Sequence, residues 1–316
     1  MAATTNGSGT IAIVTVTYNS AVVLPEFLDS LRAQTDRDFV LYAVDNASKD
    51  DSLAILREAE SSPGIPAVVI DAGANLGIAA GNNIGIERAL SDGASAVLLL
   101  NNDTVLAADM IEQLRRAANE GHIDILAPVI EGIDPVGSLW FGGGHLRRWA
   151  GFHAFHDKAG KMLARDRTTQ WPAEPTDYAP TCALLVQARV FDQVGLMDPS
   201  YFIYCDDVDF AIRCHQHGYQ YYVTSSARML HKVGSLSGGG RSQFGVNWNT
   251  RNEVLLSRRY LRGPRLWVAL VYIQLRTIAG FATRRDNWAG FKERQAWFGR
   301  GLRADLNDHS VPQIST

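Results

Sequence analysis

Apolar runs and amphipathic segments alternate along the first hundred residues of the chain. Four runs are apolar almost throughout, at residues 11–18, 39–45, 66–71 and 96–103. Runs of this kind are typical of strands that are buried on both faces of a parallel sheet. The segments between them carry apolar residues at helical spacing and predict helices at residues 25–34, 50–60 and 77–90. We therefore expect a Rossmann-like α/β fold with a mostly parallel central sheet flanked by helices.

The pattern is looser after Asp103. It predicts helices near residues 110–119 and 206–218, strands at 125–130 and 219–226, and a strand that runs into a helix over 182–195. A segment rich in Gly and Trp, residues 139–153, predicts a loop or a hairpin. The small residues of 234–243 predict a mobile loop.

The last part of the chain combines helical spacing with positive charge. Between Arg251 and Arg303 there are twelve Arg or Lys residues and three acidic residues, a balance of +9. The whole chain has a net charge of −3, which leaves −12 for the remainder. This segment either faces an anionic partner, such as phospholipid headgroups, a phosphorylated carrier or nucleic acid, or packs on the acidic body.

The apolar core of that segment, around residues 266–285, is interrupted by Gln274 and Arg276 and is too short to predict a membrane-spanning helix. An interfacial helix with Trp267 and Tyr272 at headgroup depth is one alternative, and packing on the body is the other.

Composition indicates a globular chain in a reducing compartment. The 316 residues are 46% hydrophobic and 20% charged, which is sufficient for a sizeable core. Three cysteines, Cys182, Cys205 and Cys214, form an odd set without zinc-like spacing, so a disulfide framework is not expected. The first residues lack a signal-peptide pattern. We expect a cytoplasmic location, with peripheral contact at the inner face of the cell membrane as an alternative.

Polar residues follow three of the predicted parallel strands at the point where each strand ends. They are Thr17-Tyr18-Asn19, Asp45-Asn46 and Asn101-Asn102-Asp103. Because the carboxyl ends of parallel strands meet at one edge of a sheet, these groups predict a ligand site there, although each could also be a turn or a helix cap. Gly77, Gly81 and Gly85 would bring a helix start close to a bound phosphate. Neither a dinucleotide fingerprint nor a P-loop is present.

An acidic cluster and a histidine complete the candidate chemistry. Asp206, Asp207 and Asp209 fall within one helical turn, after an aromatic stretch that contains Tyr201, Phe202 and Tyr204. Such a cluster is a helix cap, a metal site or a base. His231 ends the next strand beside a Gly-rich loop and is a candidate metal ligand, although a lone His is more often structural.

Six ordered motifs resemble the inverting glycosyltransferases of family two, which have the GT-A fold, and in particular the bacterial rhamnosyltransferase-like branch. They are VTYN, AVDNASKDDS, NLGIAAGNN, LLLNNDT, GLMDPSYFIYCDDVDFAIRCHQHG and ARMLHKVGS, within residues 11–235. The resemblance implies a metal-dependent transfer of a sugar, rhamnose or another deoxysugar among the candidates, to a glycan or lipid-linked acceptor. It also implies a dTDP- or UDP-sugar donor and Mg²⁺ or Mn²⁺.

The resemblance assigns roles to individual residues. Thr17, Tyr18 and Asp45 would hold the base and ribose of the donor, and Asn75, Gly77 and Asn82 would lie along its sugar or diphosphate. Asn19 is a further candidate for donor binding. Asn101, Asn102 and Asp103 occupy the DxD motif, in which Asp103 would bind the metal together with His231. Asp207 would be the catalytic base. The residue types alone, and not the resemblance, suggest Trp140, Arg241, Trp248 and Arg251 for contacts with the acceptor or the diphosphate, and Trp140 could instead belong to the core.

Two positions differ from the family pattern. Asn101 replaces the first Asp of the DxD motif, so the metal site has a single protein carboxylate. Asp206-Asp207 replaces a Glu-Asp pair, which leaves open whether Asp207 or Asp206 is the base. A non-catalytic nucleotide- or sugar-binding module is therefore one alternative. A nucleotidyltransferase is a weaker one, because no basic Gly-rich loop follows the first strand.

We expect four regions. Residues 1–10 form a flexible N-terminus, 11–105 a nucleotide-sugar-binding half, 106–250 an acceptor-binding and catalytic half of the same domain, and 251–316 a basic helical C-terminal extension. We expect no nucleic-acid partner, and self-association into a homo-oligomer is left open.

Overall fold

The computed structural model describes residues 9–133, 135, 137–163, 170–232, 242–283 and 287–312. Most of the expected flexible N-terminus and of the expected mobile loop at 234–243 lies outside the described residues.

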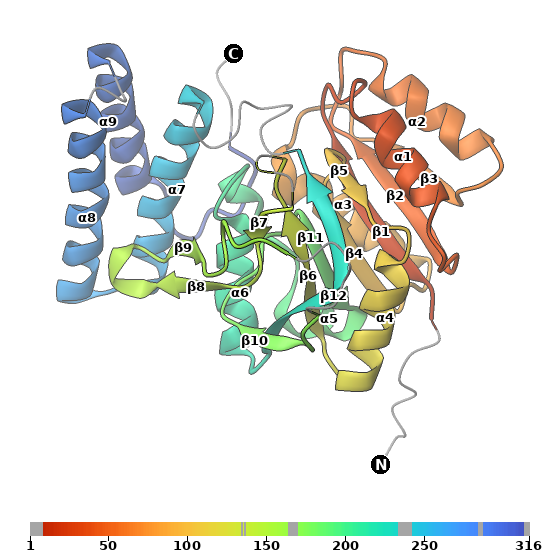
Figure 1. Ribbon diagram of the computed structural model, residues 1–316. Helices are drawn as coiled ribbons and strands as arrows, with labels where there is room; N and C mark the ends of the chain where they lie inside the picture. Colours follow the sequence, from red (N-terminus) through yellow and green to blue (C-terminus); the bar gives the residue numbers. More distant parts are fainter. Residues whose placement is uncertain are drawn as a thin grey trace.

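A mixed ten-stranded sheet forms the centre of the molecule (Figure 1), with the order β10-β12-β6-β11-β4-β1-β2-β3 along its main path. Two short strands lie off that path, β5 against β12 and β7 against β6. The strands are β1 Ile11–Thr17, β2 Phe39–Asp45, β3 Ala67–Asp71, β4 Ala96–Leu100, β5 Thr104–Leu106, β6 Ile125–Glu131, β7 Leu139–Phe141, β10 Glu174–Thr176, β11 Ala183–Gln187 and β12 Tyr221–His231. A separate hairpin pairs β8, Gly144–Arg147, with β9, His153–His156.

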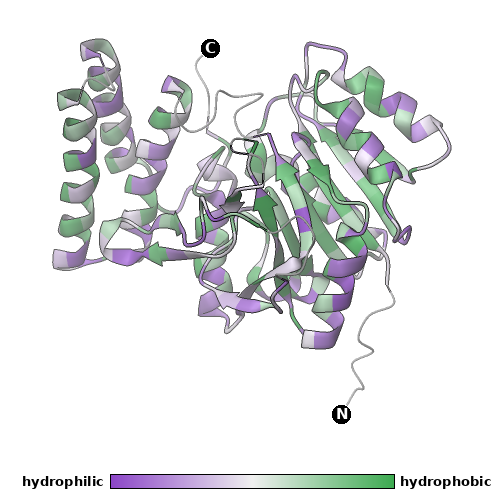
Figure 2. Cartoon of the chain, in the orientation of Figure 1, coloured by the Kyte–Doolittle hydropathy of each residue, from purple (hydrophilic) through white to green (hydrophobic). Residues whose placement is uncertain are grey.

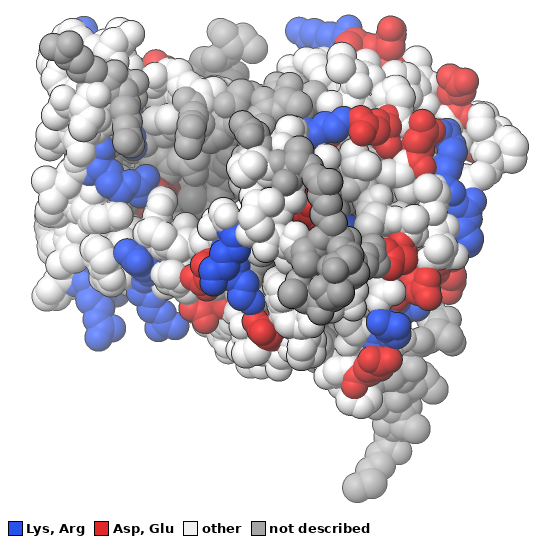
Figure 3. Space-filling model, viewed as in Figure 1, with Lys and Arg blue, Asp and Glu red and all other residues white. Residues whose placement is uncertain are grey.

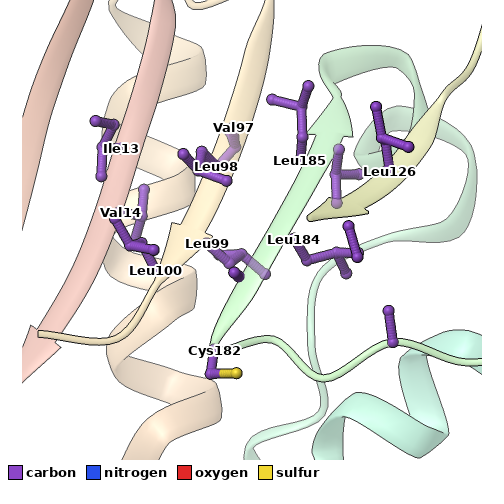
Figure 4. Close-up of a cluster of buried hydrophobic side chains, with 14 of the residues drawn as sticks. Ile13, Val14, Val97, Leu98, Leu99, Leu100, Leu126, Cys182, Leu184 and Leu185 are labelled. Carbon is purple, nitrogen blue, oxygen red and sulfur yellow. The ribbon is translucent and has the colours of Figure 1, made fainter. Parts of the chain in front are cut away.

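The strands β3, β2, β1 and β4 are parallel, as the apolar runs predict. In this register Thr17 lies beside Asp45, so the polar ends of the strands meet at one edge of the sheet. The side chains of Ile13 and Leu98 are completely buried, and Figure 4 shows them on neighbouring strands with Leu184 of β11 nearby. Burying a side chain of this size stabilises a fold by about 1.5–3 kcal/mol.

Strand β11 departs from the simple parallel arrangement. It lies between β4 and β6 and is antiparallel to both. Beyond it, β12 is parallel to β6 and continues to His231, which is five residues further than the pattern predicts. The end of β12 pairs with β5, a three-residue strand that the sequence pattern did not predict. The predicted loop or hairpin at 139–153 forms β7, β8, the short helix η1 (Arg148–Ala150) and the start of β9.

Helices flank the sheet and extend beyond it (Figure 1). They are α1 Leu24–Arg32, α2 Ser52–Ser61, α3 Gly77–Ser91, α4 Met110–Gly121, α5 Ala188–Val194, α6 Asp206–Gln216, α7 Gln243–Tyr260, α8 Gly263–Ala282 and α9 Trp288–Arg303, with the short helix η2 at Pro199–Tyr201.

The glycines of α3 bring that helix close to the sheet. A Cβ atom on Gly81 would lie 2.8 Å from the side chain of Val16, and one on Gly85 would lie 2.5 Å from that of Val14. These two glycines therefore permit close packing of α3 on β1, and neither lines the cavity described below, so the interpretation that they approach a ligand is wrong for them. Gly77 is the exception, because it lines that cavity and has a φ of +81°.

Candidate active site

A cavity of about 650 Å³ opens at the carboxyl ends of β1 and β4. Ten of the residues that were given a candidate role from the sequence line it. They are Tyr18, Asn75, Gly77, Asn101, Asn102, Asp103, Trp140, Asp206, Asp207 and His231. Residues from both halves of the chain thus contribute to one site, as expected where a ligand binds at the carboxyl edge of such a sheet.

Other singled-out residues lie outside the lining of this cavity. Thr17 and Asp45 are buried and hydrogen-bonded to each other at 3.0 Å, and Asp45 also accepts hydrogen bonds from Ser48. The side-chain oxygen of Asn19 accepts a hydrogen bond from the backbone N–H of Lys49. These contacts hold the loop that follows β2.

Asn82 is buried, with its amide 3.7 Å from the sulfur of Met197. Trp248 and Arg251 belong to α7 and contact the loop that precedes α6. Arg241 lies outside the described residues.

Asp103 and His231 are brought together by the pairing of β5 with β12. Thr104, next to Asp103, pairs with His231, so two side chains 128 residues apart in the sequence come within 3.1 Å, measured from Asp103 Oδ1 to His231 Nε2. Burial disfavours the charged imidazolium, but Cys182 and Asp103 outweigh it and raise the pKa of His231 to about 10. Trp140 packs edge-on against the ring of His231.

These side chains fit a divalent cation. Asp103 supplies a carboxylate, His231 an imidazole and Asn101 an amide oxygen, all on the wall of one cavity. Among the described residues, no three His, Cys, Asp or Glu side chains gather closely enough to hold an ion by themselves. Because Mg²⁺ and Mn²⁺ favour oxygen ligands and are bound with substrate phosphates in many sites, a diphosphate would be needed to complete this one.

The acidic pair Asp206-Asp207 begins α6. Tyr178 donates a hydrogen bond of 2.6 Å to Asp207 Oδ2, and the backbone N–H of Val208 donates one of 2.8 Å to Oδ1. Burial raises the pKa of Asp207, and the Tyr178 hydrogen bond partly opposes this. Burial and the neighbouring Asp207 raise the pKa of Asp206 well above its usual range. Asp207 is the less buried of the two, and its carboxylate is oriented by two donors, so it is the better placed to take a proton.

The loop before this pair has an unusual backbone. Phe202, Tyr204 and Cys205 all have φ between +61° and +66°, a conformation that costs a residue with a Cβ about 1–2 kcal/mol. Asn252, completely buried in α7, holds the loop by donating hydrogen bonds of 2.8–2.9 Å to the carbonyls of Tyr201, Ile203 and Tyr204. Helix α7 is therefore part of the structure that positions the acidic pair.

Sequence reasoning missed two residues that the structure brings to the site. Tyr178 and Asn252 hold Asp207 and its loop, and neither stands in a recognisable motif. Asn46 lines the cavity, donates to the carbonyl of Gly77, and leaves its buried side-chain oxygen without a partner. The sequence pattern singled out Asn46, directly after Asp45 at a strand end, but gave it no individual role.

A second cavity, of about 340 Å³, adjoins the first at Asp207. Asp207, Tyr178 and Tyr204 line both cavities. The remaining wall of the second cavity comes from the β8–β9 hairpin and from the three C-terminal helices, and it includes the charged residues Glu253, Arg276 and Arg294. Glu253 and Arg276 form an ion pair at 2.9 Å.

The model of glycosyl transferase family 2 matches residues 12–190 of the chain. This range includes Asp103 and most of the residues that line the first cavity. The chain belongs to this family. This confirms the prediction of a glycosyltransferase and of the family that the six motifs resemble.

Three curated relatives have similar sequence identities to this chain. The N-acetylglucosaminyl-diphospho-decaprenol L-rhamnosyltransferase of Mycobacterium tuberculosis is 27% identical over 288 residues, which are 84% of this chain and 91% of the relative. The dTDP-rhamnosyl transferase RfbF of Shigella flexneri is 25% identical over 72% of this chain and 70% of the relative. For a hexosyltransferase of Haloferax volcanii, Agl10 of low-salt glycan biosynthesis, the identity is 27% and the match spans 62% of the relative.

Solved structures support the fold. The structure of the mannosyltransferase PcManGT of Pyrobaculum calidifontis, in complex with GDP-Man and Mn²⁺, matches with a TM-score of 0.58 at 14% sequence identity. The match covers 94% of this chain and 85% of the mannosyltransferase chain. S. aureus TarS in complex with UDP-GlcNAc also has a TM-score of 0.58, covering 93% of this chain and 79% of its own. The α/β fold with a mostly parallel sheet and a helical C-terminal region is thus confirmed as GT-A.

Proposed function

We propose that this family 2 glycosyltransferase moves a sugar from a nucleoside diphosphate to an acceptor hydroxyl with inversion at the anomeric carbon, and that Asp207 is the base. The observation that carries the proposal is the position of Asp207 in the wall shared by the two cavities. A base in this position can contact an acceptor on one side while the donor occupies the other.

The first cavity suits the donor. Tyr18, Asn46, Asn75 and Asn102 supply a side-chain ring and amides for the nucleotide and sugar. Asp103 and His231 would hold a divalent ion beside the diphosphate, and the ion, when bound, neutralises the negative charge that develops on the leaving group. Asn101, whose amide is uncharged, leaves this site with less negative charge than a DxD motif with two carboxylates would have.

The second cavity suits the acceptor. In a single displacement, the acceptor hydroxyl forms a bond to the anomeric carbon as the bond to the diphosphate breaks, and the hydroxyl proton passes to the carboxylate of Asp207. Tyr178 and the N–H of Val208 each donate to one oxygen of that carboxylate, and the lone pairs that these bonds leave over can take the proton. A positioned base of this kind contributes about 10²–10⁴-fold in rate.

The names of the relatives guide the choice of substrates. The Shigella relative is named a dTDP-rhamnosyl transferase, and the name of the mycobacterial relative includes a diphospho-decaprenol-linked sugar. We therefore propose dTDP-rhamnose or a related dTDP- or UDP-deoxysugar as the donor and a glycan or lipid-linked sugar as the acceptor. The three free cysteines fit a cytoplasmic location, with access to a lipid-linked acceptor at the inner face of the membrane.

The first experiment is donor binding, measured as the thermal shift of the purified protein. A panel of dTDP-, UDP- and GDP-sugars is tested with Mg²⁺, with Mn²⁺ and with EDTA, and ligand at about a hundred times its Kd should stabilise the fold by about 2.7 kcal/mol. We expect one nucleotide class to stabilise the protein only with metal, and Asp103→Ala to abolish that effect.

Turnover is then measured with the donor so identified. Asp207→Asn should retain the donor-induced shift and lose about 10²–10⁴-fold in kcat. A larger loss in Asp206→Asn than in Asp207→Asn would assign the base to Asp206. The wild-type protein could instead bind the donor and show no turnover with any lipid-linked or glycan acceptor. That result would favour the alternative suggested by Asn101, a non-catalytic binding module.

A further inference from the structure

One face of α8 is exposed and apolar over its whole length. Its exposed large side chains recur at helical spacing and are Trp267, Val268, Val271, Leu275, Ile278 and Phe281. Trp267 is 69% exposed and Leu275 is 58% exposed, although both are large apolar residues. At 1.5 Å per residue, the 20 residues of α8 span about 30 Å. Figure 2 shows apolar residues along α8 as well as in the central sheet.

The opposite face of α8 packs on the protein. Ala269, Leu270 and Ile273 are buried there, and Arg276 reaches the second cavity and pairs with Glu253. The helix thus has a packed side and an uncovered side, with the apolar residues of the uncovered side in a continuous stripe. A contiguous apolar surface of this kind marks an interaction site.

The charges around the stripe are positive. Helix α8 contains no acidic residue, and neither does the neighbouring segment 139–156, which forms β7 to β9. Arg262 and Arg265 are exposed at the start of α8, and Arg147 and Arg148 are exposed on the hairpin and on η1, against which α8 packs. In Figure 3, Lys and Arg side chains gather at the lower left, around the start of α8 and the hairpin.

Further aromatic side chains lie beside the middle of α8 and at its far end. Trp149 of η1 is 53% exposed and packs edge-on against Tyr272, near the middle of α8. At the far end, Phe281 packs against Trp288 and Phe291 of α9. Tryptophan and tyrosine prefer the boundary between headgroups and acyl chains, because their rings are apolar with one polar group.

We propose that this α8 face binds an anionic phospholipid surface, with the helix lying parallel to the membrane plane. An amphipathic helix with an uncharged apolar face, arginines at its edge and exposed tryptophan has the character of an interfacial helix. No helix in the described part of the chain is long and apolar enough to cross a bilayer. The inference concerns a surface outside the donor cavity and holds whatever sugar the enzyme transfers.

A second copy of the chain is a less suitable occupant. If two α8 faces packed together, parallel or antiparallel, the arginines of each copy would lie against a helix without acidic residues. They would therefore have no ion-pair partner on the α8 helix of the other copy. Anionic headgroups, in contrast, complement Arg262, Arg265, Arg147 and Arg148, at about 1 kcal/mol for each basic residue near the surface.

The test is co-sedimentation of the full chain with vesicles of phosphatidylglycerol and phosphatidylcholine, compared with vesicles of phosphatidylcholine alone. We expect binding to the anionic vesicles that weakens with added salt. The double variant Val271→Glu/Leu275→Glu should bind at least about tenfold more weakly, because it places two negative charges on the face that would contact the membrane. Both positions are exposed, so the fold should be retained, as circular dichroism would check.

The matched control is Val22→Glu, which adds an acid at a side chain that is 91% exposed, close to α1 on the opposite side of the molecule (Figure 1). It should bind the anionic vesicles as the wild type does. Three outcomes would overturn the proposal: no vesicle binding, equal binding by the double variant, or a wild-type dimer in light scattering that the double variant converts to a monomer. The last would assign the face to a second copy of the chain.

Discussion

At the scale of single residues, the chemistry depends on how one carboxylate is held. Asp207 accepts hydrogen bonds from Tyr178 and from the N–H of Val208, while its neighbour Asp206 is buried more deeply. Two like charges on adjacent residues raise the cost of ionising both. The Tyr178 hydroxyl favours the ionised form of Asp207, which is the form that a base requires.

The change Tyr178→Phe tests this. Loss of the donated hydrogen bond should raise the pKa of Asp207, so the acidic limb of the pH profile of kcat/KM should move to higher pH. The measurement is kcat/KM between about pH 5 and 9, and Tyr42→Phe is the control, because it removes a Tyr–Asp hydrogen bond far from the site, to Asp92. An unshifted limb in Tyr178→Phe would show that the hydrogen bond does not tune the base.

At the scale of elements, the C-terminal helix α7 supports a loop that belongs to the catalytic half. Asn252 donates to three carbonyls of the loop before α6, and Trp248 stacks on Phe202 at 4.9 Å between ring centroids. The boundary expected at residue 251 therefore divides a helix whose residues on both sides contact the same loop.

Asn252→Ala should lower both stability and turnover. Buried carbonyls left without a donor cost about 1–3 kcal/mol, and the loop would no longer be held with Phe202, Tyr204 and Cys205 at positive φ. We expect kcat to fall at least about tenfold. Asn247→Ala, on the same helix, removes a buried amide that bonds to Glu293 of α9 and should cost stability with little loss in kcat. Equal kcat losses in the two variants would indicate a general effect of destabilised α7.

The sequence was most informative where structure is local. The strands β1, β2, β3 and β4 and their helices follow from apolar periodicity, because each is long enough to show its own pattern. Strand β5 has only three residues and forms because β12 lies beside it, which no local pattern reports. The same holds for the site: Asp103 and Asp207 stand in motifs, whereas Tyr178 and Asn252 act through contacts made by distant parts of the chain.

At the scale of the whole molecule, a buried carboxyl group of the site lowers the free energy of unfolding at neutral pH. Burial of Asp206 beside Asp207 means that the folded protein binds a proton at Asp206 more tightly than the unfolded chain does. Its contribution to stability is therefore fully present below the unfolded pKa of about 4 and is lost as the pH rises through the raised folded pKa. At neutral pH, this carboxyl group destabilises the native state.

Asp206→Asn should accordingly raise the Tm at neutral pH, and the gain should shrink as the pH is lowered toward 4. Thermal unfolding across that range measures it. Glu58→Gln, which removes a charge at an exposed position of α2, should show no such pH-dependent gain. A constant difference in Tm at all pH values would contradict the raised pKa of Asp206.

The position of the antiparallel strand β11 between β4 and β6 also affects how the chain folds while it is being synthesised. Strand β4 pairs with β1 on one side, but its other neighbour, β11, begins at Ala183, more than eighty residues later. During synthesis from the N-terminus, the parallel half can form first while β4 presents an apolar, unpaired edge. Such an edge is a template for pairing with other chains. Nascent or truncated chains that end before β11 would therefore depend on chaperones, and the ribosome's rate through residues 101–182 sets how long that edge stays open.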